Sequence, residues 1–356
     1  MSDLKVQDIG EQGLLKRLQR FCPPGIVGDD AAVIATQSQQ FLVVTTDVLV
    51  DEVHFSDRTT SPEDAGWRAA AANLSDLAAM GALPLGITVG LGLRSDVSVA
   101  WVERLYQGMT DCLQQYDTAI VGGDICRSPI ITVAITAFGQ VHPSRAIRRS
   151  AAQVGDAIVV TGVHGASRAG LELLLHPELR QDISDRDRLA LIQAHRRPRP
   201  RLDVLPLLWE VLGVKESDSS TSVPSSTSSP DPLSLIPYPC FRVAGMDSSD
   251  GLADALVQIC QASSVGAKIE RSKITLPLAL NNWDSTQAID YALYGGEDFE
   301  LVLCLPPVPA NTLVQKLGNE AAIIGTITPD LEVQLIDQTG KNPDQVLNLS
   351  QGFQHF

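Results

Sequence analysis

The stretch from Phe41 to Phe55 places a carboxylate directly after an apolar run. The residues 41–44 form a continuous, largely β-branched segment, which predicts a strand buried on both faces. The run breaks at Thr45, Thr46 and Asp47. A carboxylate at the end of a buried strand is costly unless a cation, a hydrogen-bond donor or water meets it. A turn in which Asp47 bonds its own backbone is the structural alternative, and this stretch alone favours neither.

Acidic residues recur beside glycine, serine or threonine where other apolar segments end. Taken singly, such a residue is most often a helix cap or a turn residue. Their repetition along the chain raises the hypothesis that they converge on one site. The positions are Asp29 with Asp30, Asp47, Asp76, Asp124, Asp247 with Asp250, and Glu297 with Asp298.

Asp76 does not fit the reading as a cap. It lies inside a predicted helix, residues 61–80, that opens with a Ser61-Pro62 start signal and is rich in alanine. Asn73 precedes it by three positions and shares its helix face. An ionised carboxylate in such an environment must be neutralised, and a hard divalent cation such as Mg²⁺ takes oxygen ligands of this kind.

Several convergent carboxylates require several metal ions, or metal ions together with a polyphosphate, and this points to ATP chemistry. The phosphate loop GxxxxGK followed by Ser or Thr is absent from the sequence, as is the protein-kinase motif set. Gly122-Gly123-Asp124 is by itself a weak phosphate-loop signal. One arginine of the pair Arg148-Arg149 can meet a phosphate, with a solvated surface pair as the alternative.

The charge of the chain excludes some partners. Its 27 Lys and Arg against 42 Asp and Glu give a net charge of −15, so nothing draws it to nucleic acid or an anionic membrane.

The six cysteines of the chain show no CxxC spacing, which favours reduced thiols over a zinc site or disulfides. The first residues lack a signal-peptide pattern, and no apolar run reaches the roughly 18 residues of a membrane helix. We therefore expect a cytoplasmic protein.

The order of predicted elements indicates an α+β fold in two domains. We expect an N-terminal domain over 1–145 with a mixed sheet and helices on one face, and a C-terminal domain over 146–356.

The Ser-, Thr- and Pro-rich segment at about 215–239 is predicted to be a flexible insertion without a catalytic role. The basic run 195–201 is predicted to be a stiff structural connector. Predicted helices are 4–20, 61–80, 97–116, 166–175, 185–196, 201–213 and 250–262, and predicted strands are 31–35, 41–46, 85–93, 119–121, 130–141, 156–161 and 299–305.

The motifs in their order resemble the thiamine-monophosphate kinase family, over nearly the whole chain. They are Gly28-Asp29-Asp30-Ala31-Ala32, Thr45-Thr46-Asp47 with His54-Phe55, Asn73-Leu74-Ser75-Asp76-Leu77-Ala78-Ala79-Met80-Gly81-Ala82, Gly122-Gly123-Asp124, Asp247-Ser248-Ser249-Asp250-Gly251-Leu252 and Gly295-Gly296-Glu297-Asp298-Phe299-Glu300-Leu301. The resemblance implies an aminoimidazole ribonucleotide synthetase-like fold, in which the N-terminal mixed sheet pairs across a homodimer. Two positions depart from the family pattern, Ser248 and the His164-Gly165 turn.

The resemblance also implies an activity in thiamine biosynthesis, transfer of the γ-phosphoryl group of ATP to thiamine monophosphate, with several Mg²⁺ ions. It implies metal ligands at Asp30, Thr45, Thr46, Asp47, Asp76, Asp124, Asp247 and Asp250. It implies ATP contacts at Tyr106, Gly123, Asp124, Arg149 and Ser249, and substrate contacts at His54, Glu297 and Phe353. No general base is expected, because the acceptor phosphate is already anionic at neutral pH.

Two other functions remain open at this point. One is another ATP-dependent enzyme of the same superfamily, such as one similar to selenophosphate synthetase; Cys22 before Pro23-Pro24 does not provide the reactive cysteine which that enzyme would need. The other is a non-enzymatic acidic module that binds divalent metals, which would not require a carboxylate inside an apolar helix.

Overall fold

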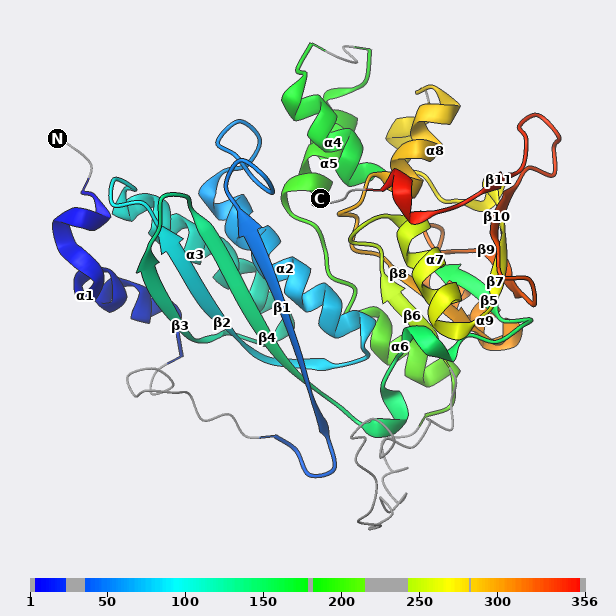
Figure 1. Ribbon diagram of the computed structural model, residues 1–356, viewed down its shortest axis with the longest axis horizontal. Helices are drawn as coiled ribbons and strands as arrows, with labels where there is room; N and C mark the ends of the chain where they lie inside the picture. Colours follow the sequence, from blue (N-terminus) through cyan, green and yellow to red (C-terminus); the bar gives the residue numbers. More distant parts are fainter. Residues whose placement is uncertain (1–3, 24–35, 179–181, 215–242, 282, 353–356) are drawn as a thin grey trace.

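The computed structural model describes residues 4–23, 36–178, 182–214, 243–281 and 283–352 (Figure 1). Two mixed sheets with their helices lie side by side, one built before residue 142 and the other after residue 156. The predicted strand 31–35, the predicted insertion 215–239 and the site candidates Asp30 and Phe353 lie outside the described residues. Among the helices in the described ranges, none has the length and apolar character of a membrane span.

Within the described ranges, the first sheet has four strands in the order β1-β4-β2-β3, namely β1 (Phe41–Val50), β4 (Thr132–Val141), β2 (Leu83–Leu93) and β3 (Ile120–Arg127). β4 pairs antiparallel with β1 and β2, whereas β2 and β3 are parallel, so the predicted mixed sheet is confirmed. Helix α2 (Pro62–Ala79) packs on one face and α3 (Val99–Leu113) packs on α2. Helix α1 (Val6–Leu18) lies at the far side, against α3 and β3 (Figure 1).

Among the described strands, β1 pairs with β4 alone and has one open face, and the prediction that it is buried on both faces is wrong for the single chain. Its residues alternate: Phe41 and Val43 pack against the core, whereas Leu42, Val44 and Val48 are 56%, 52% and 48% exposed. The physical reason is that the helices cover only one face of this sheet, so half of an apolar strand has nothing to pack against.

The Gly122-Gly123-Asp124 motif lies within β3 rather than after it, since the strand continues to Arg127. The sheet register aligns Asp124 with Gly90, Ala134 and Val48 on the four strands. Aligned residues project to the same face of a sheet, so Asp124 belongs to the open face. It also lies three strand spacings from β1, roughly 14 Å.

Helix α2 is held tightly by its neighbour α3. A Cβ atom added at Gly66 would meet the Leu105 carbonyl oxygen at 2.0 Å, and one added at Gly108 would meet the Glu63 carbonyl oxygen at 1.8 Å. Only glycine permits this approach of the two backbones. The contact fixes α2, and with it every side chain that α2 directs toward the second domain.

The second sheet has seven strands in the part of the chain that the structure describes, in the order β11-β10-β7-β9-β5-β8-β6. Its strands are β5 (Ala157–Val160), β6 (Ala244–Asp247), β7 (Gly266–Glu270), β8 (Leu301–Leu305), β9 (Ala322–Thr328), β10 (Val333–Ile336) and β11 (Gln345–Val346). The accompanying helices are α4 (Ala166–Leu175), α5 (Asp185–Arg196), α6 (Val204–Val211), α7 (Leu252–Ser263), α8 (Ser285–Tyr294) and α9 (Pro307–Leu317).

The basic run 195–201 joins the two halves. Trp67 Nε1 on α2 donates to the Pro198 carbonyl oxygen at 2.8 Å, and Arg197 Nε lies 2.8 Å from Asp64 Oδ1 at the start of α2. Arg201 Nη1 donates to Glu300 Oε2 of the second domain at 2.5 Å. The predicted connector is therefore a strap that lies across α2 and ties it to the second sheet.

Candidate functional site

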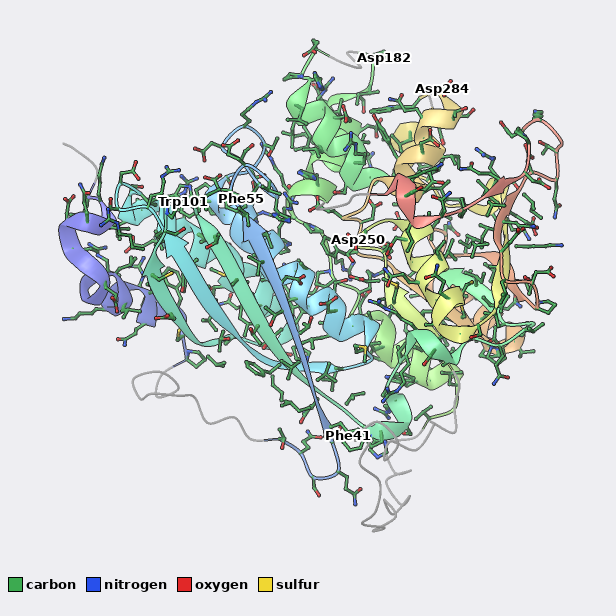
Figure 2. The ribbon with its side chains drawn as sticks, in the orientation of Figure 1. Phe41, Phe55, Trp101, Asp182, Asp250 and Asp284 are labelled. Atoms are coloured by element: carbon green, nitrogen blue, oxygen red, sulfur yellow. The ribbon has the colours of Figure 1, made fainter. Side chains whose placement is uncertain are left out.

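A cavity of about 1500 Å³ lies where the two halves meet. Its walls come from β1, α2, α4, α5 and α8 and from the segments 52–59, 247–250, 295–299 and 351–352. Asp250 lies between the halves, on the side of the second domain that faces β1 (Figure 2). The predicted site residues in the cavity wall are Thr46, Asp47, His54, Asp76, Asp247, Ser249, Asp250 and Glu297.

Three carboxylates at one end of the cavity share a high proton affinity. Burial, followed by the charges of Asp247 and Asp250, raises the pKa of Asp47 to about 6. Burial and Asp47 raise the pKa of Asp76 to about 6, against the lowering effect of Thr45 and Arg149. Burial and Asp76 raise the pKa of Asp247 to about 6. At neutral pH these groups are ionised and repel one another, so the site attracts positive charge.

Hydroxyl groups orient the carboxylates. Thr45 and Asp47 are two apart on β1 and share the face that α2 covers, and Thr45 Oγ1 donates to Asp76 Oδ2. Ser75 Oγ on α2 donates to Asp247 Oδ2 at 2.6 Å, and Ser249 Oγ donates to Asp247 Oδ1 at 3.0 Å. Each carboxylate keeps lone pairs for further ligands.

This donor set fits Mg²⁺. It consists of carboxylate and hydroxyl oxygens, which a hard cation prefers over sulfur or nitrogen. In the described ranges, no three His, Cys, Asp or Glu side chains are arranged to hold an ion by themselves. Mg²⁺ is commonly held by one or two carboxylates with waters and substrate phosphates completing the octahedron, so a sparse protein ligand set suits it.

The other end of the cavity carries Glu297 on a constrained loop. Gly296, Glu297 and Phe299 all have left-handed backbone angles, φ 67°, 58° and 53°. Two of these are non-glycine residues, a costly arrangement that persists where surrounding contacts enforce it. Asp298 supplies such contacts, because its carboxylate accepts from the backbone N–H groups of Gly165 and Ser167 at 2.6 and 2.9 Å.

His54 follows β1 at the same end of the cavity. Its Nδ1 accepts from the Val50 backbone N–H at 3.1 Å, so in the neutral ring the proton is on Nε2. Thr46 borders the cavity, but its hydroxyl lies 2.9 Å from Thr136 Oγ1 across the strand pair.

Two residues of this cavity, Arg68 and His195, were missed by the sequence analysis. Arg68 forms an ion pair with Glu297, and His195 lies beside both. Spacing offered one signal: Arg68 and Asp76 are eight apart on one predicted helix and so share a face. His195 carried no such signal, because the basic run around it favoured a structural interpretation.

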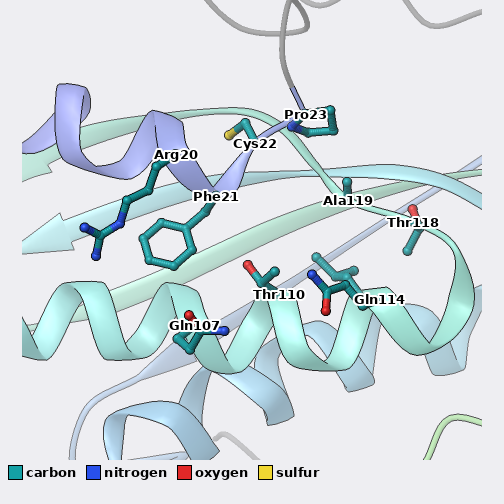
Figure 3. A pocket seen from close by; sticks show the side chains of 10 residues that line it. Arg20, Phe21, Cys22, Pro23, Gln107, Thr110, Gln114, Thr118 and Ala119 are labelled. Atoms are coloured by element: carbon teal, nitrogen blue, oxygen red, sulfur yellow. The ribbon is translucent and has the colours of Figure 1, made fainter.

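The predicted ATP residues on the first domain do not line this cavity. Tyr106 is 4% exposed on α3, with its ring 5.7 Å from that of Phe21. A second pocket of about 520 Å³ lies beside these rings, between the segment 20–23 and α3 (Figure 3).

Gly123 and Asp124 lie on β3, far from the acidic end in the single chain. Arg149 Nη1 donates to Gln258 Oε1 at 2.5 Å.

The two departures from the family pattern contact each other. His164 Nε2 and Ser248 Oγ are 3.1 Å apart, and both side chains are buried. Burial lowers the pKa of His164 to about 4, so its ring is neutral near pH 7. Ser248 therefore has the local partner that a polar residue in this loop requires.

Comparison with known proteins agrees with both halves of this fold. Residues 28–141 match the AIR synthase related protein, N-terminal domain, and residues 243–338 match the corresponding C-terminal domain. A thiamine-monophosphate kinase of Synechococcus elongatus is 51% identical over 100% of this chain and 99% of its own length.

Solved structures give the same result. The thiamine-monophosphate kinase of Stenotrophomonas maltophilia K279a has a TM-score of 0.72 at 31% identity, and covers 90% of this chain and 94% of its own. AaThiL complexed with AMPPCP and TMP has a TM-score of 0.66 at 29% identity, and the match covers 98% of this chain and 99% of that chain.

Mg²⁺ should stabilise the protein in a pH-dependent way. The folded-state pKa values near 6 exceed the ordinary value of about 4 for aspartate, so the contribution of this cluster to the metal-free unfolding free energy falls as pH rises through about 6. Above that pH the carboxylates are ionised and free to bind a cation; below it, protons compete. We expect millimolar Mg²⁺ to raise Tm by roughly 5 °C at pH 8 and by much less at pH 5.

The measurement is a thermal unfolding scan at both pH values, with KCl at equal ionic strength as the control for simple screening. An equal gain at pH 5 and pH 8, or the same gain with KCl, would contradict the proposed cation site.

Proposed function

Because this chain belongs to the thiamine-monophosphate kinase family, we propose that it transfers the γ-phosphoryl group of ATP to thiamine monophosphate, giving thiamine diphosphate. The observation that carries the proposal is the division of one cavity into two chemically different ends. Asp47, Asp76 and Asp247 form an anionic end suited to metal-bound phosphates. Glu297 and His54 form an end suited to a cationic heterocycle and its phosphate.

The reaction needs positioning more than proton transfer. A phosphate oxygen of thiamine monophosphate is already anionic at neutral pH, so no side chain has to deprotonate it. The barrier comes from bringing two polyanions together in line. Divalent cations held by Asp47, Asp76 and Asp247 would neutralise this charge. The part played by the chain is to hold oxygen ligands in place, through the Thr45, Ser75 and Ser249 hydroxyl groups that orient Asp76 and Asp247.

The substrate end has complementary charge. Thiamine carries a thiazolium cation and an aminopyrimidine, and the Glu297 carboxylate can meet either through charge or hydrogen bonding. His54 presents Nε2–H as a donor for the substrate phosphate. Phe353, outside the described residues, remains a proposed stacking partner of a substrate ring.

We also propose that the enzyme acts as a homodimer with shared sites. The open face of the first sheet carries exposed Leu42, Val44 and Val48, an apolar surface that a second copy would cover. Asp124 belongs to that same face, on the opposite edge strand from Asp47. Pairing two such faces would bring Asp124 of one protomer close to the acidic end of its partner's cavity. Tyr106, Gly123, Arg149 and Ser249 are proposed to contact ATP in this assembly.

The activity itself is tested with purified protein, Mg²⁺, ATP and thiamine monophosphate. We expect stoichiometric formation of thiamine diphosphate and ADP, measured by chromatography, and no product when the divalent cation is chelated. A folded protein that hydrolyses ATP without forming thiamine diphosphate would contradict the assignment.

Asp76→Asn should retain the fold and lose at least about 10²-fold in kcat. Asparagine keeps the shape and the acceptor for Thr45 Oγ1 but removes the charge that holds a cation. Steady-state kinetics and a thermal scan measure the two effects. Asp187→Asn is the matched control, because Asp187 also accepts from a neighbouring hydroxyl, Ser184 Oγ at 2.8 Å, but lies at an exposed helix start outside the cavity wall. Wild-type turnover in Asp76→Asn would remove the metal-site argument.

Shared sites are tested by complementation. Asp124→Asn and Asp47→Asn copies, each inactive alone, are co-expressed with different tags. Equal expression of the two copies makes about half of the dimers mixed. If Asp124 acts in the partner's cavity, each mixed dimer has one intact site and one doubly mutated site. About a quarter of all sites should then be active. Co-expression of Asp47→Asn with Asp76→Asn, both in one cavity, is the control and should stay inactive. No recovery in the first pair would place Asp124 in the cavity of its own chain or outside the site.

A further inference from the structure

Helix α2 reaches both ends of the cavity with one face. Arg68, Ala72 and Asp76 follow each other at four-residue intervals, and all three line the cavity. Asp76 belongs to the acidic end. Arg68 is 3% exposed and forms an ion pair with Glu297, which the second domain supplies. A buried arginine from one domain thus holds the carboxylate that the other domain presents.

The contacts of His195 define its protonation. Its Nε2 lies 3.4 Å from Arg68 Nη1, and because a guanidinium only donates, Nε2 must be the acceptor. The ring proton is therefore on Nδ1, 3.1 Å from Ser167 Oγ and 3.6 Å from Glu297 Oε2. Burial, followed by the charge of Arg68, lowers the pKa of His195 to about 2, so the ring stays neutral. His195 consequently packs against Arg68 as a neutral acceptor and leaves the charge of Arg68 for Glu297.

Glu297 retains one oxygen for a ligand. Oε1 receives the Arg68 donor, whereas Oε2 accepts no hydrogen bond from the residues that the structure describes and lies 3.6 Å from His195 Nδ1. The side chain is 36% exposed, so the carboxylate remains accessible. Its backbone N–H donates to the Ser249 carbonyl oxygen at 2.6 Å, which ties this residue to the loop that follows Asp247 and carries Asp250.

We propose that Arg68 and His195 are positioning residues for substrate specificity, which hold Glu297 so that Oε2 accepts a hydrogen bond from an N–H donor of the substrate's aminopyrimidine. This rests on the proposed thiamine monophosphate kinase function.

The proposal separates substrate binding from chemistry. In Arg68→Met, Glu297 loses its anchor and its compensating charge, so KM for thiamine monophosphate should rise roughly 10- to 100-fold. KM for ATP and kcat should change by less than about 3-fold, because the acidic end is untouched. Arg68→Lys keeps the charge without the planar fork and should recover part of the loss. His195→Phe should give a smaller rise in the same direction, since Arg68 loses its lateral support.

A double-mutant cycle with Glu297→Gln isolates the pairing. Once Glu297 is neutral, the loss of Arg68 should cost little more, so the effects on KM for thiamine monophosphate should be strongly non-additive. Arg197→Met is the matched control: it removes another ion pair between the strap and α2, Arg197 with Asp64, outside the cavity wall. It should lower Tm without changing KM for thiamine monophosphate.

Calorimetric titration of thiamine monophosphate gives a readout that does not depend on turnover. Weaker binding by Arg68→Met than by Arg197→Met at matched stability supports the positioning role. Unchanged binding and KM in Arg68→Met, additive effects in the cycle, or equal losses for both substrates would overturn it. Wild-type protein that binds thiamine monophosphate but forms no product would contradict the proposed function alone, and wild-type protein that does not bind it would overturn both.

Discussion

The mutual repulsion of Asp47, Asp76 and Asp247 is the constraint on which this structure depends. The three carboxylates come from strand β1, helix α2 and the end of strand β6, and burial with each other's charge raises the pKa of each to about 6. A fold gains nothing from such an arrangement by itself, because like charges in a poorly solvated cavity oppose folding. Its value lies in what it can bind, and cation-bound phosphates are the ligands that match its charge and its oxygen donors.

Helix α2 transmits this constraint to the rest of the molecule. Its close contact with α3 at Gly66 fixes its position relative to α3. The hydrogen bond from Trp67 to Pro198 of the strap, residues 195–201, fixes its position relative to the second domain. Along one face it then carries Arg68 to one end of the cavity and Asp76 to the other. The distance between the Arg68–Glu297 ion pair and the three aspartates is thereby set by a rigid helix rather than by a loop, as the proposed reaction, which is governed by positioning, requires.

Local sequence patterns predicted much of the fold and of the acidic end. The helix 61–80 and the strand 130–141 follow from start signals and apolar runs, and the structure has them at Pro62–Ala79 and Thr132–Val141. Asp76 was identifiable because a carboxylate inside an alanine-rich helix has an energetic cost visible in the sequence itself. Arg68 and His195 were not, because an arginine on a helix and a histidine in a basic run are ordinary at solvated positions. Their burial depends on a second domain that no local pattern describes.

The sequence by itself determined the order of the motifs, which is similar to that of one kinase family, and it predicted the residues that bear the chemistry: oxygen ligands without a catalytic base. Tertiary structure alone decided how they are grouped. It placed Asp47 and Asp76 on one side of the first sheet and Asp124 on the other, and it left half of the apolar strand 41–50 open. The physical reason is that composition and spacing show how much free energy it costs to bury a given side chain in its local segment. The face of the sheet that this side chain occupies depends instead on strand register and on which elements pack against that face.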